Sequence, residues 1–478
     1  MKKFVISMIT LCFGLNLQAQ MIEDALNMSI SNTYITPRAG GLGIAYYGIS
    51  DDFASIAYNP AGLALIGKGE ISFGFNINPN STETEFLANN MNTFSTNIYL
   101  TNLGIILPFK TNLGNATLGI GYYMESNFNN TMEFGALNPY STYIQYTAEE
   151  SRKRGWGIAE NFATYLWLAD DNYDTPIKKG LFQEAMINEK GGIKDFSGAI
   201  ALELSENLTV GFTLTGKWGN YNYLREYIET DINNIYNEFI YRNENGKLVF
   251  DNVDFHHLKV DESVDQDISG VTASLGLMGK IENFVRIGFT LKFPSYYEVN
   301  ENFSQTAIAY FDNGDIRDTM YLFSNYYKII TPWIFSGGIS FNIEGLIATA
   351  GIEYTDLTQM EFSGESNLEL LNLDIKKQMT ALIKYGAGLE WQTPFLPVDL
   401  RVGFSYTTPP YSSSFKGEER IGLSFGTGIY LQNNMRLDLV AEYQQYKKLW
   451  NIYGNSSETK LYFTQKPINI GIQLIYRY

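Results

Sequence analysis

The chain has 478 residues, with 34 Tyr, 31 Phe and 43 Gly, and only 18% of its residues are charged. This composition favours a sheet-rich protein over a helical enzyme. The formal net charge is −17 and the one short basic run is Arg152-Lys153-Arg154, which argues against a nucleic-acid-binding face. We attribute the acidity to long, exposed, water-soluble loops rather than to cation attraction.

Residues 1–20 are expected to be a secretory signal peptide. Lys2-Lys3 form a basic start, Phe4–Leu17 is apolar, and Gln18-Ala19-Gln20 is a small or polar exit. The apolar run is too short for a spanning helix. The single cysteine, Cys12, lies inside this run without a lipoprotein-like context, so we expect a mature chain without disulfides or thiolate chemistry.

The next unusual stretch is Arg38–Gly67. It is dense in Gly and Ala, carries the acidic pair Asp51-Asp52, and ends in Asn59-Pro60-Ala61-Gly62 followed by a short apolar tail. It has too many small residues for an ordinary amphipathic helix and is too apolar for a solvated linker. We therefore predict that it lies inside the sheet formed by the rest of the chain.

Segments with alternating apolar and polar residues make up most of the chain outside Arg38–Gly67. In Val285–Phe293, for example, the five odd-numbered residues are apolar and face away from Arg286, Gly288, Thr290 and Lys292. This template predicts about fourteen strands. They run over 69–78, 95–109, 115–124, 194–204, 208–219, 266–281, 284–298, 328–343, 345–358, 377–392, 397–408, 418–432, 435–447 and 465–478.

Alternation fits either a soluble sandwich or a membrane barrel, and three features favour the barrel. The strands are about ten residues long, as a tilted spanning strand requires. Aromatic residues gather at strand ends. Short turns follow even-numbered strands, and longer connections follow odd-numbered ones. We predict an all-β fold, a fourteen-stranded antiparallel transmembrane β-barrel of the outer membrane, with both termini periplasmic and extracellular loops at 125–193, 220–265 and 299–327.

Three stretches within the loops have helical spacing, and the terminal residue is informative too. The first contains Ile158, Phe162, Tyr165 and Leu166, the second Leu181, Phe182, Ala185 and Met186, and the third Leu224, Ile228, Ile232, Ile235 and Phe239. Such helices would either cap the barrel or offer an apolar groove that captures ligand. The terminal Tyr478 resembles the end signal that barrel-insertion machinery recognises.

Enzyme signatures are missing from the sequence. The two histidines, His256 and His257, are adjacent and would point to opposite faces of a strand, so a shared metal is not expected. There is no HExxH, GxSxG or Walker A pattern. We predict no catalytic residues, no metal, no cofactor and no nucleic-acid partner, and we expect a monomer.

Strand parity places many charged residues on the lumen face. They are Glu203, Lys217, Lys280, Arg286, Lys292, Glu353, Lys384, Glu390, Arg401, Arg436, Asp438, Glu442 and Arg477. One interpretation is that opposite charges pair across the lumen or with the internal segment. The other is that a few cations bind an anionic head group, for which Lys217, Lys292 and Lys384 are best placed. Numerous inward glycines leave room that another segment must fill.

The motif Asp-Asp-x-Ala-Ser-x-x-x-Asn-Pro-Ala-Gly-Leu, after a signal peptide and before a barrel, resembles the FadL/TodX family of outer-membrane transporters. The matching residues are Asp51, Asp52, Ala54, Ser55, Asn59, Pro60, Ala61, Gly62 and Leu63. The resemblance implies a hatch over residues 21–67 inside a barrel over 68–478. It also implies a lateral exit at the third strand, where Gly119 and Gly121 could permit a departure from regular pairing or could simply accommodate the hatch.

The resemblance further implies passive uptake of hydrophobic or amphipathic molecules, such as long-chain fatty acids or aromatic hydrocarbons. We expect apolar loop helices to collect the ligand, an apolar pocket to bind it, and hatch movement to open a path. Asn59, Asp51 and Asp52 would bond the hatch to the wall, and Pro60 and Gly62 would fix its turn. The partners would be a lipid-like ligand and outer-membrane lipid. The alternatives are a relative that handles secreted proteins and a lipid-modifying enzyme.

Overall fold

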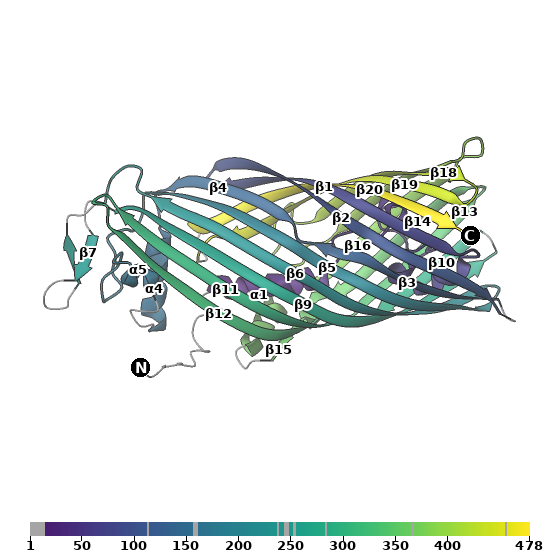
Figure 1. Cartoon of the computed structure of the whole chain (residues 1–478), viewed down its shortest axis with the longest axis horizontal. Helices are drawn as coiled ribbons and strands as arrows, with labels where there is room; N and C mark the ends of the chain where they lie inside the picture. The colour runs from purple at the N-terminus through teal and green to yellow at the C-terminus, as the bar shows by residue number, and fades with distance from the viewer. Residues whose placement is uncertain are drawn as a thin grey trace.

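The chain forms one long β-barrel with its N-terminal region inside (Figure 1). The structure is a computed structural model that describes residues 15–111, 114–155, 161–236, 239–242, 248–251, 255–282, 284–364, 368–454 and 457–478. The expected signal peptide, with Cys12, lies outside these residues up to residue 14. Helix α1 begins at Leu15 and continues to Ser29, and no described helix is long and apolar enough to span a membrane.

The regular elements follow one another in a simple order. The helices are α1, α2 (Pro37–Gly41), α3 (Ser55–Tyr58), η1 (Pro60–Leu65), α4 (Tyr143–Arg154), α5 (Phe162–Tyr165), η3 (Leu357–Gln359), α6 (Glu369–Gln378) and η5 (Ser457–Thr459). The strands of the first half are β1 (Glu70–Phe86), β2 (Asn89–Lys110), β3 (Asn115–Asn127), β4 (Asn130–Asn138), β5 (Leu181–Ser205), β6 (Leu208–Thr230), β7 (Phe239–Arg242), β8 (Leu248–Asp251) and β9 (Phe255–Ile281). Those of the second half are β10 (Val285–Lys292), β11 (Tyr296–Phe311), β12 (Ile316–Ile330), β13 (Ile334–Ile343), β14 (Leu346–Asp356), β15 (Glu361–Ser363), β16 (Ala381–Gln392), β17 (Val398–Thr407), β18 (Arg420–Gln432), β19 (Met435–Asn451) and β20 (Lys460–Arg477).

Antiparallel pairing closes these strands into a barrel of fourteen positions, which confirms the predicted fold class. Some positions are occupied by two segments in succession, namely β3 with β4, β10 with β11, β13 with β12, and β14 with β15. The ring closes where β1 pairs with β20, from Glu70 opposite Arg477 onward. The hairpin β7–β8 is a separate small sheet.

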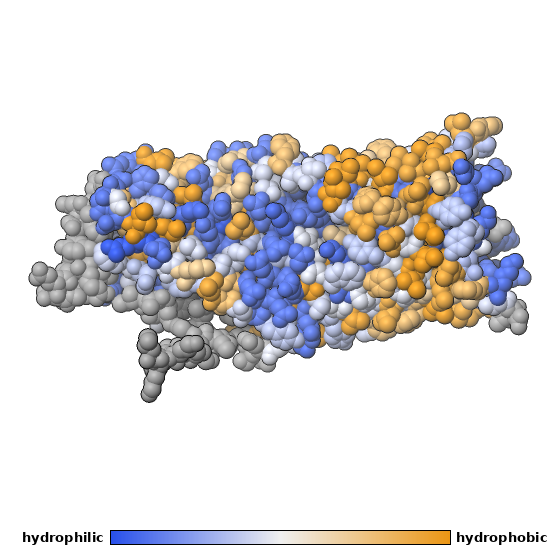
Figure 2. Space-filling model, in the orientation of Figure 1, coloured by the Kyte–Doolittle hydropathy of each residue, from blue (hydrophilic) through white to orange (hydrophobic). Residues whose placement is uncertain are grey.

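On the face seen in Figure 2, apolar residues dominate the half of the barrel that holds the C-terminus, and polar and apolar residues are mixed over the other half. In the half that holds the C-terminus, outward side chains such as Phe73, Phe212, Phe289 and Phe404 are about half exposed. Many strands run well beyond this apolar band, because β5, β6 and β9 each exceed 22 residues. A spanning strand needs only about 9–11 residues, so the rest of each of these strands extends past the apolar band. This part of the barrel is here called the projecting half.

These projections correct the predicted loop helices. Leu181 and Met186 belong to β5 and Leu224 and Ile228 to β6, where they pair with neighbouring strands. Ladder hydrogen bonds to two flanking strands decide the conformation of an apolar stripe that is ambiguous by itself. The helix predicted around Phe162 is present as α5, whereas Ile158 lies outside the described residues.

Inside the projecting half, α4 and α5 pack against each other and against inward aromatic side chains, while α1 contacts α6. Tyr143 of α4 contacts Tyr227 and Tyr453 at ring-centroid distances of 5.5 Å, and Phe162 of α5 joins the same cluster. These helices therefore fill the interior, as expected for a cap, and most of their apolar residues are buried, although Tyr165 of α5 is exposed.

Candidate functional site

Residues 30–66, here called the luminal segment, lie within the part of the barrel that carries the apolar band and are mostly buried there. Inward glycines allow its backbone to touch the wall. A Cβ at Gly288 would stand 2.0 Å from Tyr47 O, and one at Gly211 would stand 2.3 Å from Pro60 C. The same close approach occurs at Gly276, Gly338, Gly386, Gly388 and Gly403. The space predicted from the inward glycines is therefore filled by this segment.

The Asn59-Pro60-Ala61-Gly62 turn connects the luminal segment to the wall. Asn59 Nδ2 donates to Leu277 O of β9 and to Tyr47 O, both at 3.2 Å, while its Oδ1 accepts from Ala61 N as the N-cap of η1. Pro60 supplies the fixed φ that starts this helix. A Cβ at Gly62 would stand 1.8 Å from Ser50 O, so only glycine fits there.

A buried ion network holds the other side of the segment. The Arg38 guanidinium donates two hydrogen bonds of 2.8 Å to Glu390 of β16 and also forms an ion pair with Asp51. Asp51 in turn accepts from Arg286 of β10 at 2.8 Å, and Glu390 accepts from Arg401 of β17 at 2.6 Å. Bidentate charge-assisted hydrogen bonds fix the relative orientation of the two groups as well as pairing their charges. They therefore hold the luminal segment in one position.

Asp52 does not bond the segment to the wall, contrary to the sequence-based expectation. Its Oδ1 accepts from Ala54 N at 2.8 Å, so it stabilises the turn within the segment. Asp51, by contrast, reaches Arg286 on the wall. Neighbouring residues in a turn point in different directions, which explains why the two carboxylates have different roles.

The three lysines predicted to contact a ligand head group are all paired with carboxylates. Lys217 Nζ contacts Glu125 and, at 2.9 Å, Asp195, and its side chain is fully buried. Lys292 pairs with Glu125 at 2.6 Å and Lys384 with Glu353 at 3.0 Å. These three lysines therefore form ion pairs, as the first of the two interpretations predicted. The same is true of all the other predicted lumen charges except Glu442. Glu442 accepts from Asn469 instead.

The backbone hydrogen-bond ladder of the wall is interrupted between β2 and the β3–β4 strand, and this interruption, bridged by side-chain hydrogen bonds, is here called the gap. β2 pairs with β3 only from Asn102 opposite Tyr123 to Lys110 opposite Asn115, so the described residues 89–101 pair with β1 alone. A register shift at Met124/Ser126 turns β3 away. β4 then lies against the lumen side of β1, where Thr84 Oγ1 donates to Glu133 O.

Gly119 and Gly121 are not at this gap, although the sequence suggested them. Both are paired on the β2 side and the β5 side. A Cβ at Gly121 would stand 2.5 Å from the Phe53 ring, and one at Gly119 would stand 3.1 Å from Ile56. They accommodate the luminal segment, and the departure from regular pairing occurs a few residues later, at the bulge.

Residues 30–33 of the luminal segment bond to the released edge of β3. Ser31 Oγ donates to Glu125 O at 2.8 Å, and Thr33 Oγ1 donates to Met124 O at 2.7 Å. Asn32 exchanges two hydrogen bonds with the Asn127 backbone, at 2.8 and 2.9 Å. Because a buried carbonyl without a partner costs about 1–3 kcal/mol, these contacts replace the strand partner that β3 lacks.

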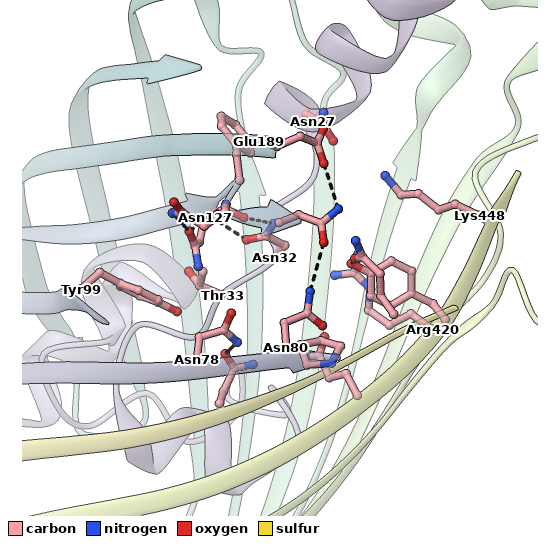
Figure 3. Close-up of a pocket in the computed structure, with 18 of the residues that line it drawn as sticks. Asn27, Asn32, Thr33, Asn78, Asn80, Tyr99, Asn127, Glu189, Arg420 and Lys448 are labelled. Atoms are coloured by element: carbon pink, nitrogen blue, oxygen red, sulfur yellow. Dashed lines mark hydrogen bonds between the residues drawn. The ribbon is translucent and has the colours of Figure 1, made fainter. Parts of the chain in front are cut away.

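A polar cavity lies beside the gap, between α1, the luminal segment and the wall (Figure 3). It holds about 90 Å³ of space accessible to water. Its lining is dominated by amides and hydroxyls, with three charged residues. The lining residues are Asn27, Asn32, Thr33, Asn78, Asn80, Tyr99, Asn127, Phe128, Asn129, Asn130, Glu189, Tyr221, Arg420, Gln444, Tyr446, Lys448, Gln465, Pro467 and Asn469. This cavity is therefore not the apolar pocket expected from the sequence.

Sequence reasoning missed the two cations of this cavity, Arg420 and Lys448. Both continue the inward parity of their strands, Arg420 two residues before Gly422 and Lys448 two after Tyr446. Extending the same parity to the strand ends would have found them. Their approach to Asn27 and Asn32, far away in the sequence, could not have been predicted in this way.

Fold and site together define a plugged fourteen-stranded barrel with a break in its wall. The same fold is found in a Pseudomonas aeruginosa FadL homologue, with 11% identity over 94% of this chain and 99% of that one and a TM-score of 0.59. The CymD monoaromatic hydrocarbon channel has 12% identity, coverage of 95% and 98%, and a TM-score of 0.54. The P. putida toluene transporter TodX has 11% identity, coverage of 89% and 94%, and a TM-score of 0.53.

No protein-family model and no curated protein matches the sequence. The fold is thus the one that the Asn-Pro-Ala motif predicted. At these identities the likeness concerns the fold, and the function must be argued from the site.

Proposed function

We propose that this protein is an outer-membrane channel for passive passage of hydrophobic or amphipathic small molecules, which leave the lumen through the gap between β2 and β3–β4. A closed barrel with an apolar outer band is one of the two architectures that can span a lipid bilayer. Passage down a concentration gradient needs no catalytic group or energy source. The toluene transporter TodX and the CymD monoaromatic hydrocarbon channel, which share this fold, support this substrate class.

The observation that carries the proposal is the contact between residues 30–33 and the released edge of β3. The same residues that fill the barrel also complete its wall, so the luminal segment acts as a hatch. If Ser31, Asn32 and Thr33 withdraw, the carbonyls of residues 124–127 become free and the gap becomes continuous with the lumen. Exposed Phe94 and Ile98 on the outer face of β2 border this exit.

Direct uptake is the first test. Cells lacking the protein should take up labelled fatty acids and aromatic hydrocarbons more slowly than the parent, and Asn59→Ala should change the rate of uptake, because Asn59 bonds the hatch to β9. Equal uptake in all three strains would contradict the transporter assignment. Loss of surface proteins in the deletion strain, or lipid turnover by the purified protein, would favour the alternatives instead.

A crosslink across the gap tests the exit route. Asn97 Nδ2 on β2 donates to Asn127 Oδ1 on β3 at 3.1 Å, so the pair Asn97→Cys and Asn127→Cys can be joined by a short reducible bis-thiosulfonate. Joining them should block uptake, and reduction should restore it. The matched control is Leu107→Cys with Leu118→Cys, which face each other where β2 and β3 are already paired. Uptake that survives the first crosslink would exclude the lateral route.

A further inference from the structure

The polar cavity beside the gap contains a guanidinium group with no counter-ion. Arg420 forms no ion pair and no side-chain hydrogen bond with any residue that the structure describes, and its guanidinium lies over the Tyr446 ring at 4.2 Å from the ring centroid. Lys448 has one distant partner, Glu23 at 3.8 Å. Both cations point toward the amides on the opposite side of the cavity (Figure 3). Elsewhere in the lumen the cations have carboxylate partners at 3.5 Å or less.

Neither nearby carboxylate forms an ion pair with Arg420 among the described residues: Glu189 lines the cavity, and Glu442, which lies beside Gly422, accepts from Asn469 and has a buried Oε1 without a partner. Glu189 accepts from Asn130 at 3.0 Å and from the Tyr221 hydroxyl at 2.8 Å. Its hydrogen-bonding capacity is directed to the β4 and β6 sides, away from Arg420. The cavity therefore keeps a cationic side, which an oxyanion would complete.

The rest of the lining offers both donors and acceptors. Asn27 makes no side-chain hydrogen bond to a described residue, and Tyr99 accepts from Asn76 at 2.6 Å, which leaves its own proton to donate. Asn80 is 6% exposed, and its buried Oδ1 has no partner among the described residues. An acceptor of this kind calls for a donor such as a hydroxyl group.

An unsubstituted hydrocarbon would fit this cavity poorly. Its methylene groups would cover amide groups without replacing their hydrogen bonds to water, at a cost of about 1–3 kcal/mol for each group. A simple carboxylate would satisfy the cations and still leave Asn80 without a donor. The lining instead matches a head group that has an oxyanion and hydroxyl groups side by side.

We propose that this cavity binds the head of an amphiphile that combines an oxyanion with hydroxyl groups, an acidic sugar or a glycerol phosphate, with Arg420 and Lys448 holding the oxyanion. The inference rests on the proposed function only in treating this ligand as cargo. It narrows the cargo from hydrophobic compounds in general to anionic, hydroxyl-bearing amphiphiles. The tail of such a ligand can lie in the adjacent gap, beside Phe128 and the outer face of β2.

Binding to the purified full-length protein in a non-ionic detergent tests the inference apart from uptake. The probes are decyl glucuronide, decyl glucoside and decanoate, which share a tail and differ in charge and hydroxyl groups, together with a lysophosphatidylglycerol and inorganic phosphate. Decyl glucuronide or lysophosphatidylglycerol should bind about tenfold or more tightly than decyl glucoside and decanoate, because one charge-assisted bond accounts for about that factor. Which of the two binds better identifies a carboxylate or a phosphate head.

Two variants assign the effect to the cavity. Arg420→Gln and Lys448→Gln should each weaken binding of the anionic probe about tenfold and leave the glucoside unchanged. Lys447→Gln is the control, since Lys447 neighbours Lys448 and has the opposite parity. Heat-dependent mobility on gels reports whether each variant is folded, and Arg420→Lys retains the charge if Arg420→Gln does not fold.

Three results would overturn the inference: equal affinity for glucuronide and glucoside, equal affinity for glucuronide and decanoate, or unchanged affinity in the Arg420 and Lys448 variants. Complete competition by inorganic phosphate alone would show a small-anion site rather than a head-group site. A failure of uptake with intact binding would contradict the proposed function and leave this site standing.

Discussion

The two halves of the barrel are filled in different ways. Within the apolar band the luminal segment touches the wall backbone to backbone, as at Gly288 and Tyr47, and buried ion pairs fix it. Beyond the band, large side chains such as Tyr143, Tyr227 and Tyr453 fill the interior, and the strand ladder is interrupted beside β2. In the half within the apolar band, displacing the luminal segment is costly, because it would break backbone contacts and separate buried ion pairs. The polar cavity and the gap lie where that close contact ends, so opening there costs least.

Breaking the ion network should have the largest effect. Glu390→Ala leaves Arg38 and Arg401 buried without their shared carboxylate, which we expect to lower the free energy of unfolding by about 3–5 kcal/mol. The midpoint of urea unfolding in micelles measures this loss. Lys328→Ala, which breaks the exposed pair with Glu298, should change it by less than about 1 kcal/mol. Similar effects of the two variants would contradict the distinction between the halves.

Adding a side chain at one of the inward glycines that contact the luminal segment should displace this segment from the wall. Gly288→Val forces a branched side chain against Tyr47 O, and we expect a cost of about 3 kcal/mol, at the upper end for overpacking. Conductance in planar bilayers should rise as the luminal segment moves away from the wall. Gly198→Val is the control, since a Cβ there meets nothing within 4 Å. Unchanged conductance in Gly288→Val would show that this contact does not seal the lumen.

The projecting half should respond to pH through Glu229. Burial raises the pKa of this carboxyl to about 7, although Tyr143 N, Gln183 and Tyr227 donate hydrogen bonds to it. The folded form therefore holds a proton that the unfolded form releases near pH 4.5. Stability should fall as pH rises from about 4.5 to 7, by about 3 kcal/mol in total.

Glu229→Gln should remove that slope because glutamine stays neutral across the range. Unfolding midpoints at pH 5 and pH 8 give the comparison, and Glu226→Gln, on the outer face of the same strand, is the control. A parent protein whose stability rises between about pH 4.5 and 7 would contradict the assignment of a protonated Glu229.

The smallest effect should come from one contact at the gap. Thr33→Val removes the hydroxyl that donates to Met124 O, at an expected cost of about 1–2 kcal/mol. Hydrogen exchange at residues 30–33 should accelerate about tenfold. Thr93→Val on β2 is the control because its buried hydroxyl has no partner among the described residues. Equal exchange in both variants would show that Thr33 does not hold the segment to β3.

The sequence by itself determined the number of strands, the face each one turns to the lumen, and the identity of the segment that fills it. Period-two alternation is a local property, and in Val285–Phe293 it separates outward from inward residues without knowledge of the partners. The same rule predicted the inward charges and the glycine-lined space. It failed at Leu181 and Leu224, where an apolar stripe fits a helix and a strand equally and pairing with β4, β5, β6 and β9 made the choice.

Only the tertiary structure decided where the wall opens and what lies beside the opening. Gly119 and Gly121 invited a break in β3, but the break occurs at Met124/Ser126, where residues 30–33 replace the lost partner strand. Arg420 and Lys448 face Asn27 and Asn32 because closure of the barrel places the two ends of the chain next to each other. A hydrogen bond or an uncompensated charge depends on groups that are distant in sequence, so no local pattern reveals it.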